Sequence, residues 1–371
     1  LEGFTYGSVN APTGKEWESP ENLALNKEQP HAYFFPFQHL DNARKVLPEN
    51  SKYWQSLDGD WKFHWAPDPD SRPKDFYQTE YDVSSWDAIP VPSSWNIYGI
   101  QKDGSQKYGT PIYVNQPVIF QHSVKVDDWR GGVMRTPPAN WTTYKDRNEV
   151  GSFRRDFEIP QDWDGRETFI SFDGVDSFFY LWINGQYVGF SKNSRNTADF
   201  NITPYLQKGK NTVAAEVYRS SDGSFLEAQD MFRLPGIFRT VALYSVPKVH
   251  FRDLVATPDL DATYTDGSLT VNAEIRNLGK KAIKDYKVYY SLYANKLYSD
   301  ENTLVDGFLS PVIDKIAPNE TGSVQTVLKV KAPNKWSAEF PYRYTLVAEL
   351  KDKKNKTIEM VSTIVGFRKV E

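Results

Sequence analysis

Short runs of β-branched and aromatic residues recur along the whole chain, and no segment shows a convincing helical period. The clearest example is the pair of runs Tyr180–Ile183 and Gln186–Phe190, which flank Asn184-Gly185. Asn-Gly between two such runs is the strongest short-range signal for a β-hairpin, because a type I′ turn needs positive φ at both central residues. The sequence therefore predicts an all-β fold.

Further runs of this kind divide the chain into two β-sandwiches. Four of them precede residue 247 and predict an antiparallel sandwich of the jelly-roll type: Gly151–Ile159, Thr168–Asp173, Thr212–Arg219 and Thr240–Ser245. After Val246-Pro247-Lys248 the pattern predicts about seven short strands in ~120 residues, which suits an immunoglobulin-like sandwich. The runs that indicate it are Leu269–Arg276, Lys284–Tyr293, Ser323–Val330, Tyr344–Leu350 and Thr357–Phe367.

Two stretches lack this pattern. Residues 1–50 are rich in Pro, Asn and Glu, apart from the apolar segment His31–Phe37, and are interpreted as an arm that docks on the first domain. The predicted organisation is thus an arm at 1–50, a jelly-roll domain at 51–247 and an immunoglobulin-like domain at 248–371. Gln121–Val150 is a second irregular stretch, and a loop of this length is usually functional or disordered.

Composition excludes several classes of function. The chain has 371 residues, 44 basic and 48 acidic side chains and a net charge of −4, which argues against nucleic acid or an anionic membrane as a partner. It has no cysteine, so disulfides and thiolate metal sites are excluded. The first residue is Leu, and the sequence does not separate a cleaved signal peptide from a cloning boundary. Periplasmic or secreted localisation is favoured slightly over cytoplasmic localisation.

The densest cluster of chemically capable residues lies in Ser221–Arg239, which reads SDGSFLEAQDMFRLPGIFR. It holds three carboxylates and two guanidinium groups, and its Gly and Pro residues break any helix or strand pattern, which predicts a long structured loop. Loops on a rigid scaffold often carry binding chemistry. Taken by itself, the segment is better explained by a turn at Asp222-Gly223 followed by ordinary surface charges, because Asp-Gly is a strong turn signal.

Several segments, in this order, resemble the N-terminal region of glycoside hydrolase family 2 β-galactosidases, from about residue 20 to residue 371. They are SLDGDWKFHW (56–65), VPSSWNIYG (91–99), TPIYVN (110–115), FDGVDSFFYLWINGQYVGFSKNSRNTADFNITPYL (172–206), SDGSFLEAQDMFR (221–233), WSAEFPYRYTLVAEL (336–350) and VGFRKVE (365–371). The resemblance implies a sugar-binding jelly roll and a first immunoglobulin-like domain. It also implies that this is the non-catalytic N-terminal part of a larger, retaining glycoside hydrolase, whose catalytic barrel follows the VGFR strand.

The resemblance also implies which residues touch substrate. Asp222 matches the Asp of the family's S-D-G-S motif, which reaches the galactose site and helps to bind sodium, and Asn115 matches an Asn that hydrogen-bonds the sugar. A carboxylate and an amide can both bind sugar hydroxyls, and a carboxylate oxygen also suits a monovalent cation. No catalytic residue is assigned to this chain. The sodium site would be shared with the barrel, magnesium is left open for the larger enzyme, and neither is expected to be required by this chain.

Alternatives remain at this point. Glu227 and Asp230 could be proposed as a glycosidase carboxylate pair, but the resemblance places the catalytic glutamates in the barrel, and the two residues are instead expected to fix their own loop with Arg233 and Arg239. Rival functions are a stand-alone carbohydrate-binding module, a structural interaction module, or the same region of a β-glucuronidase or β-mannosidase. The expected partners are a galactoside substrate and the barrel of the same polypeptide, and oligomerisation is left open. The scattered histidines show no metal-ligand spacing: His31, His39, His64, His122 and His250.

Overall fold

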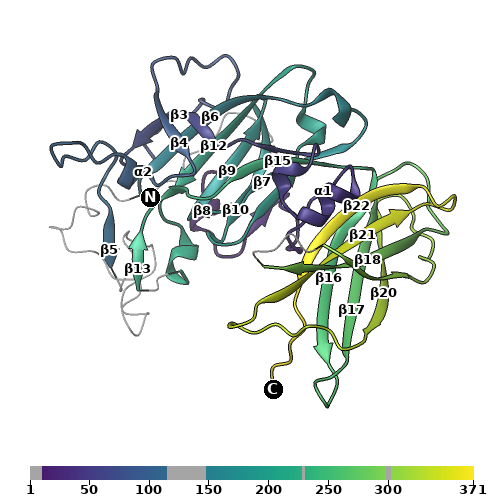
Figure 1. The fold of residues 1–371 in the computed structure, drawn as a ribbon. Coiled ribbons are helices and arrows are strands. Elements are labelled where there is room, and N and C mark those ends of the chain that lie inside the picture. Colours follow the sequence, from purple (N-terminus) through teal and green to yellow (C-terminus); the bar gives the residue numbers. More distant parts are fainter. Residues whose placement is uncertain (1–10, 115–147, 228–229, 298–301) are drawn as a thin grey trace. The chain divides into compact units, whose positions relative to one another are not determined.

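A computed structural model of the chain describes residues 11–114, 148–227, 230–297 and 302–371, and it divides into two compact units (Figure 1). The first unit comprises residues 1–28, 56–161 and 169–243, and the second comprises residues 29–55, 162–168 and 244–371. Both are built from antiparallel β-sheets, which confirms the predicted all-β fold of two sandwiches.

The first unit is built on a large antiparallel sheet, and a second, smaller sheet has four strands. The large sheet has the strand order β1 (Ala24–Leu25), β10 (Gln186–Lys192), β9 (Phe178–Ile183), β12 (Lys210–Tyr218), β6 (Val150–Glu158), β3 (Gly59–Ala66), β4 (Asp87–Val91). The smaller sheet has the order β11 (Ala198–Asn201), β7 (Glu167–Phe172), β15 (Val241–Val246), β2 (Trp54–Ser56). Two short ribbons pair β5 (Ile112–Val114) with β13 (Met231–Arg233) and β8 (Val175–Asp176) with β14 (Gly236–Ile237).

The predicted hairpin forms two adjacent strands of the large sheet. Strands β9 and β10 pair in the expected register, and Asn184 and Gly185 have φ of 51° and 76°, as a type I′ turn requires. All six side chains of β9 are buried, so this strand is apolar on both faces. Trp182 stacks on Tyr77 with ring centroids 4.8 Å apart, which shows that aromatic side chains pack in this core.

Helical structure is limited to short segments in the described part of the chain. The α-helices are α1 (Leu40–Lys45) and α2 (Trp95–Tyr98). The 3-10 turns are η1 (Glu16–Glu18), η2 (Pro48–Asn50), η4 (Gln161–Trp163), η5 (Thr203–Tyr205) and η6 (Asp222–Phe225). None of the helices in the described residues is long and apolar enough to span a membrane.

The second unit is a sandwich of a three-stranded and a four-stranded sheet (Figure 1). The three-stranded sheet has the order β16 (Val249–Leu260), β17 (Gly267–Asn277), β20 (Glu320–Val330). The four-stranded sheet has the order β19 (Leu304–Leu309), β18 (Lys287–Lys296), β21 (Tyr342–Lys351), β22 (Thr357–Val365). Every second side chain of β17 is buried, which is the period expected of a strand with one face on the core. The sequence pattern indicated five of these strands and missed two, β16 and β19, which both lie at sheet edges. Strand β16 contains Pro258, which is tolerated at an edge.

Residues 29–50 differ from the predicted arm. Within the N-terminal 55 residues, residues 1–28 belong to the first unit, whereas residues 29–55 belong to the second. Phe37 and Ala43 of this segment are buried in one cluster with Tyr293 and Val347, and the Phe37 N–H donates to the Met360 carbonyl at 2.7 Å. Apolar burial and backbone pairing with β22 therefore fix this segment to the immunoglobulin-like unit, not to the jelly roll.

A buried carboxylate in the second unit makes its stability depend on pH. The Glu359 side chain accepts a hydrogen bond from the Phe251 N–H at 2.6 Å, and burial raises its pKa to about 8 despite the Arg166 guanidinium nearby. The folded state therefore keeps the Glu359 proton up to about pH 8, whereas the unfolded chain loses it above the ordinary glutamate pKa of 4.5. Because the folded state then binds more protons, this group destabilises the unit as pH rises from 4.5 towards 8.

We predict that Glu359→Gln makes the second unit less sensitive to alkaline pH, since Gln stays neutral. The local opening free energy of the variant, minus that of the wild type, should increase by at least about 2 kcal/mol between pH 5 and pH 8, because each pH unit contributes up to about 1.4 kcal/mol. Amide hydrogen exchange of peptides from β16 and β22 reports the local opening free energy. An equal advantage at both pH values would show that Glu359 is ionised in the folded state.

Candidate functional site

The Ser221–Arg239 segment begins with a capped turn. Strand β12 ends at Tyr218, and η6 starts at Asp222 with Ser221 as its N-cap. Ser221 and Ser224 form a reciprocal capping box, and the Ser177 hydroxyl lies 2.8 Å from the Ser221 hydroxyl and 3.0 Å from the Ser224 hydroxyl. These contacts satisfy the free backbone N–H groups at the start of the turn, so the position of Asp222 is fixed by the scaffold.

Immediately before this turn, Arg219 forms a buried ion pair with Glu149. Both side chains are at most 2% exposed. The Glu149 carboxylate also accepts hydrogen bonds from the Trp95 indole N–H at 2.8 Å and the Asn96 amide at 3.0 Å. A buried ion pair is stable only when its remaining polar atoms are satisfied, and these donors meet that condition for the carboxylate. Gly109 leaves room for it, because a Cβ atom there would lie 2.2 Å from a Glu149 oxygen.

The same arginine holds both sides of a short ribbon. Its second guanidinium nitrogen donates to the Thr110 carbonyl at 3.1 Å and the Arg233 carbonyl at 3.4 Å. Thr110 leads into β5, and Arg233 ends β13, the strand paired with β5. The chain on either side of the ribbon is thus fixed through its backbone to one buried side chain.

Two aromatic rings stand on the outer part of this ribbon. Tyr113 of β5 and Phe232 of β13 are cross-strand partners, and their ring centroids are 5.3 Å apart with an interplanar angle of 58°. They are 52% and 59% exposed. The Tyr113 hydroxyl donates to the Asp230 carboxylate. Asp230 therefore helps to hold the ribbon.

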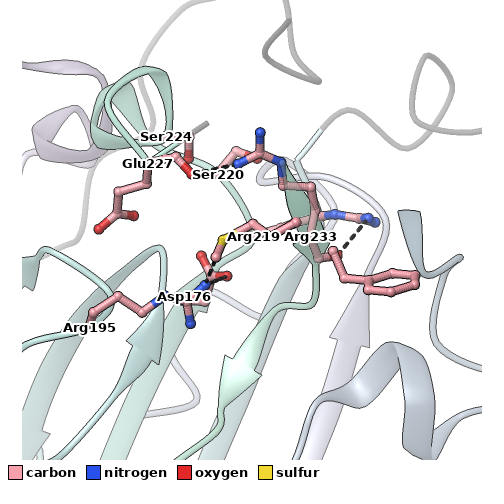
Figure 2. A pocket seen from close by; sticks show the side chains of 9 residues that line it. Asp176, Arg195, Arg219, Ser220, Ser224, Glu227 and Arg233 are labelled. Atoms are coloured by element: carbon pink, nitrogen blue, oxygen red, sulfur yellow. Dashed lines mark hydrogen bonds and ion pairs between the residues drawn. The ribbon is translucent and has the colours of Figure 1, made fainter. Parts of the chain in front are cut away.

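A pocket of mixed charge lies beside the ribbon (Figure 2). Its lining residues are Asp176, Arg195, Arg219, Ser220, Ser224, Glu227, Met231, Phe232 and Arg233. Only about 20 Å³ of it admits the centre of a water molecule, so the pocket as it stands is far smaller than a hexose. Burial raises the pKa of Asp176 to about 6, an effect that the Arg195 guanidinium, 3.8 Å from the carboxylate, partly offsets.

Glu227 is part of the packing around this pocket. Its carboxylate accepts hydrogen bonds from the Ser194 N–H at 2.7 Å and the Ser194 hydroxyl at 2.6 Å, and its carbonyl accepts from Arg233 at 2.7 Å. The expected loop-fixing role of Glu227 and Arg233 therefore agrees with the geometry. Arg239 differs from the expectation, because it donates to the Arg195 carbonyl at 2.9 Å rather than to this motif.

Asp222 does not line the pocket. Its carboxylate lies 2.8 Å from the Lys192 ammonium, and the two side chains are 8% and 3% exposed. Among the described residues, no group of three or more His, Cys, Asp or Glu side chains could hold a metal ion. The sugar and sodium contacts of Asp222 therefore stay predictions, and so does Asn115, which lies outside the described residues. Glu149, Lys192 and Ser194 were missed by the sequence reasoning, because no local spacing connects them to the loop.

Both units match one protein family. The description "Glycosyl hydrolases family 2, sugar binding domain" matches residues 54–247, and "Glycosyl hydrolases family 2" matches residues 249–368. The loop and its β-sandwich scaffold are thus those of a carbohydrate-active protein. The chain belongs to glycosyl hydrolase family 2.

Curated relatives include β-galactosidases. One from Priestia megaterium is 39% identical over 357 residues, covering 96% of this chain, and one from Halalkalibacterium halodurans is 34% identical, covering 94%. The chain spans only about a third of the length of these relatives, 32% and 31% respectively.

Solved structures show the same fold. A Bacteroides uniformis β-glucuronidase has a TM-score of 0.64 at 20% identity, covering 85% of this chain and 32% of that one. A Bifidobacterium dentium β-glucuronidase complexed with coumarin-3-O-glucuronide has a TM-score of 0.61 at 18% identity, covering 87% of this chain and 50% of that one. At this identity the likeness concerns the fold alone.

We predict that Glu149→Gln destabilises the first unit by about 3–5 kcal/mol, because it leaves the buried Arg219 guanidinium without its counter-charge. The matched control is Lys210→Gln, which removes a pair with Asp156 whose side chains are 68% and 50% exposed and should cost at most about 1 kcal/mol. Urea unfolding followed by tryptophan fluorescence measures both. Equal costs for the two variants would show that the ion pair does not anchor the site.

Proposed function

We propose that this chain is the sugar-binding part of a β-galactosidase-type glycoside hydrolase that cleaves terminal β-galactosides. The observation that carries the proposal is the 39% identity, over 96% of this chain, to a protein named β-galactosidase. The β-glucuronidases share the fold at about 20% identity, which gives less support to that substrate.

The proposed contribution of the chain is one wall of the substrate pocket, with Asn115 and Asp222 as sugar contacts. Asp222 lies three residues after Arg219 in the sequence, and Asn115 directly follows β5. Arg219 also donates a hydrogen bond to the Thr110 carbonyl, shortly before β5 begins. Two segments that are distant in sequence are therefore tied to one buried arginine. This arrangement supports the proposal, because a sugar site needs polar groups held in fixed positions.

We assign no catalytic residue to this chain. The Glu227 carboxylate is already engaged by Ser194 and the Asp230 carboxylate by Tyr113, so both have structural partners. Hydrolysis is assigned instead to a catalytic barrel in the same, longer polypeptide, which the resemblance implies. There, two carboxyl groups would act as acid/base and nucleophile, and this chain would bind and orient the galactosyl group beside them.

We predict that the 371-residue chain alone releases no phenol from an aryl β-galactoside, whereas a polypeptide extended beyond Glu371 by its own reading frame does. The extended protein should prefer the β-galactoside to the matching β-glucuronide. Release of nitrophenol measured by absorbance tests both. A preference for the glucuronide would reject the proposed substrate.

The control for the isolated chain is Glu227→Gln. If the chain alone turned over substrate and this variant did not, the catalytic site would lie in the loop. We also expect free galactose to bind the chain with a Kd no tighter than about 1 mM, since one wall supplies few contacts. Micromolar binding by calorimetry would support a stand-alone carbohydrate-binding module instead.

A further inference from the structure

Lys192 is a buried cation at the last position of β10. Its ammonium group lies 2.8 Å from Oδ1 of Asp222, and it donates a hydrogen bond to the Ser19 carbonyl at 2.5 Å. The three partners come from separate segments of the first unit: the residue after η1, the end of β10 and the start of η6. A single positive charge therefore joins these segments beneath the S-D-G-S turn.

The oxygen atoms around this ammonium are those that a sodium ion would use. A carboxylate oxygen and a backbone carbonyl oxygen are both hard ligands, and they bind a monovalent ion or an ammonium with similar chemistry. The short distance to Oδ1 and the burial of both side chains make Lys192 and Asp222 a buried ion pair. The position beside Asp222 Oδ1 thus already holds one unit of positive charge.

A sodium ion on the same carboxylate would lie close to this ammonium. Like charges at such a separation repel strongly inside a protein, where water screens them little. Asp222 carries a single negative charge, and in the described part of the chain its carboxylate is paired with the Lys192 ammonium at 2.8 Å. The donor set therefore fits the lysine and does not fit an additional sodium ion.

We propose that Lys192 is the resident monovalent cation of Asp222 and that this carboxylate takes no sodium ion. Lys192 acts as a positioning residue, because its ammonium holds Oδ1 of Asp222 and so fixes the carboxylate. The inference rests on the proposed role of Asp222 in sugar binding. It changes the expected cofactor, because the site carries its own cation in the polypeptide.

The test uses the purified 371-residue chain and measures its Tm in sodium, potassium and choline chloride at equal ionic strength. The wild type should have the same Tm in all three salts, within about 1 °C. Lys192→Gln vacates the cation position, so its Tm should fall, and sodium should restore about 3 °C or more relative to choline, because an ion that binds only the folded state raises Tm. Lys192→Arg, which keeps the charge, should remain insensitive to the choice of cation.

Lys210→Gln is the matched control, since it removes an exposed lysine–aspartate pair of the same unit and should show no response to sodium. A wild-type Tm that rises in sodium alone overturns the proposal, and this measurement needs no variant to fold. Failure of folded Lys192→Gln to respond to sodium also overturns it. The assay of the extended polypeptide on galactosides is independent, so loss of the proposed function and loss of this inference can be told apart.

Discussion

The buried ion pair between Glu149 and Arg219 is the interaction on which the rest of the site depends. The pair is separated by 70 positions in the sequence and is almost completely inaccessible to water. Nη2 of Arg219 donates to backbone carbonyls at both sides of the β5–β13 ribbon, and the next residues form the capped turn that carries Asp222. Because the hydrogen bonds go to the main chain, the anchor sets the path of the loop independently of its side chains.

The carboxylates around this anchor all have partners. Asp222 faces Lys192, Glu227 accepts from Ser194, and Asp176 lies near Arg195. Fixed, paired charges are suited to recognition, because they hold hydrogen-bonding groups in place. The geometry therefore supports the proposed sugar-binding role of this chain.

The sequence predicted the local elements well and the distant partners poorly. The hairpin at Asn184-Gly185 and most strands follow from alternation and turn chemistry, which act between neighbouring residues. No local rule identifies Lys192 as the partner of Asp222 or Glu149 as that of Arg219, because such pairs depend on tertiary packing. The same limit explains residues 29–50, whose apolar side chains indicated docking but not the unit that receives them. Asn115 remains a prediction from resemblance alone.

The division of the chain into interleaved units has a consequence for biosynthesis. Phe37 forms its backbone hydrogen bond with Met360, so the first partner leaves the ribosome more than three hundred residues before the second. At typical translation speeds this interval is roughly 15–60 s. During that time the apolar His31–Phe37 segment has no completed second unit to join. The nascent chain therefore exposes this segment to chaperones and to other nascent chains while the first unit is already folding.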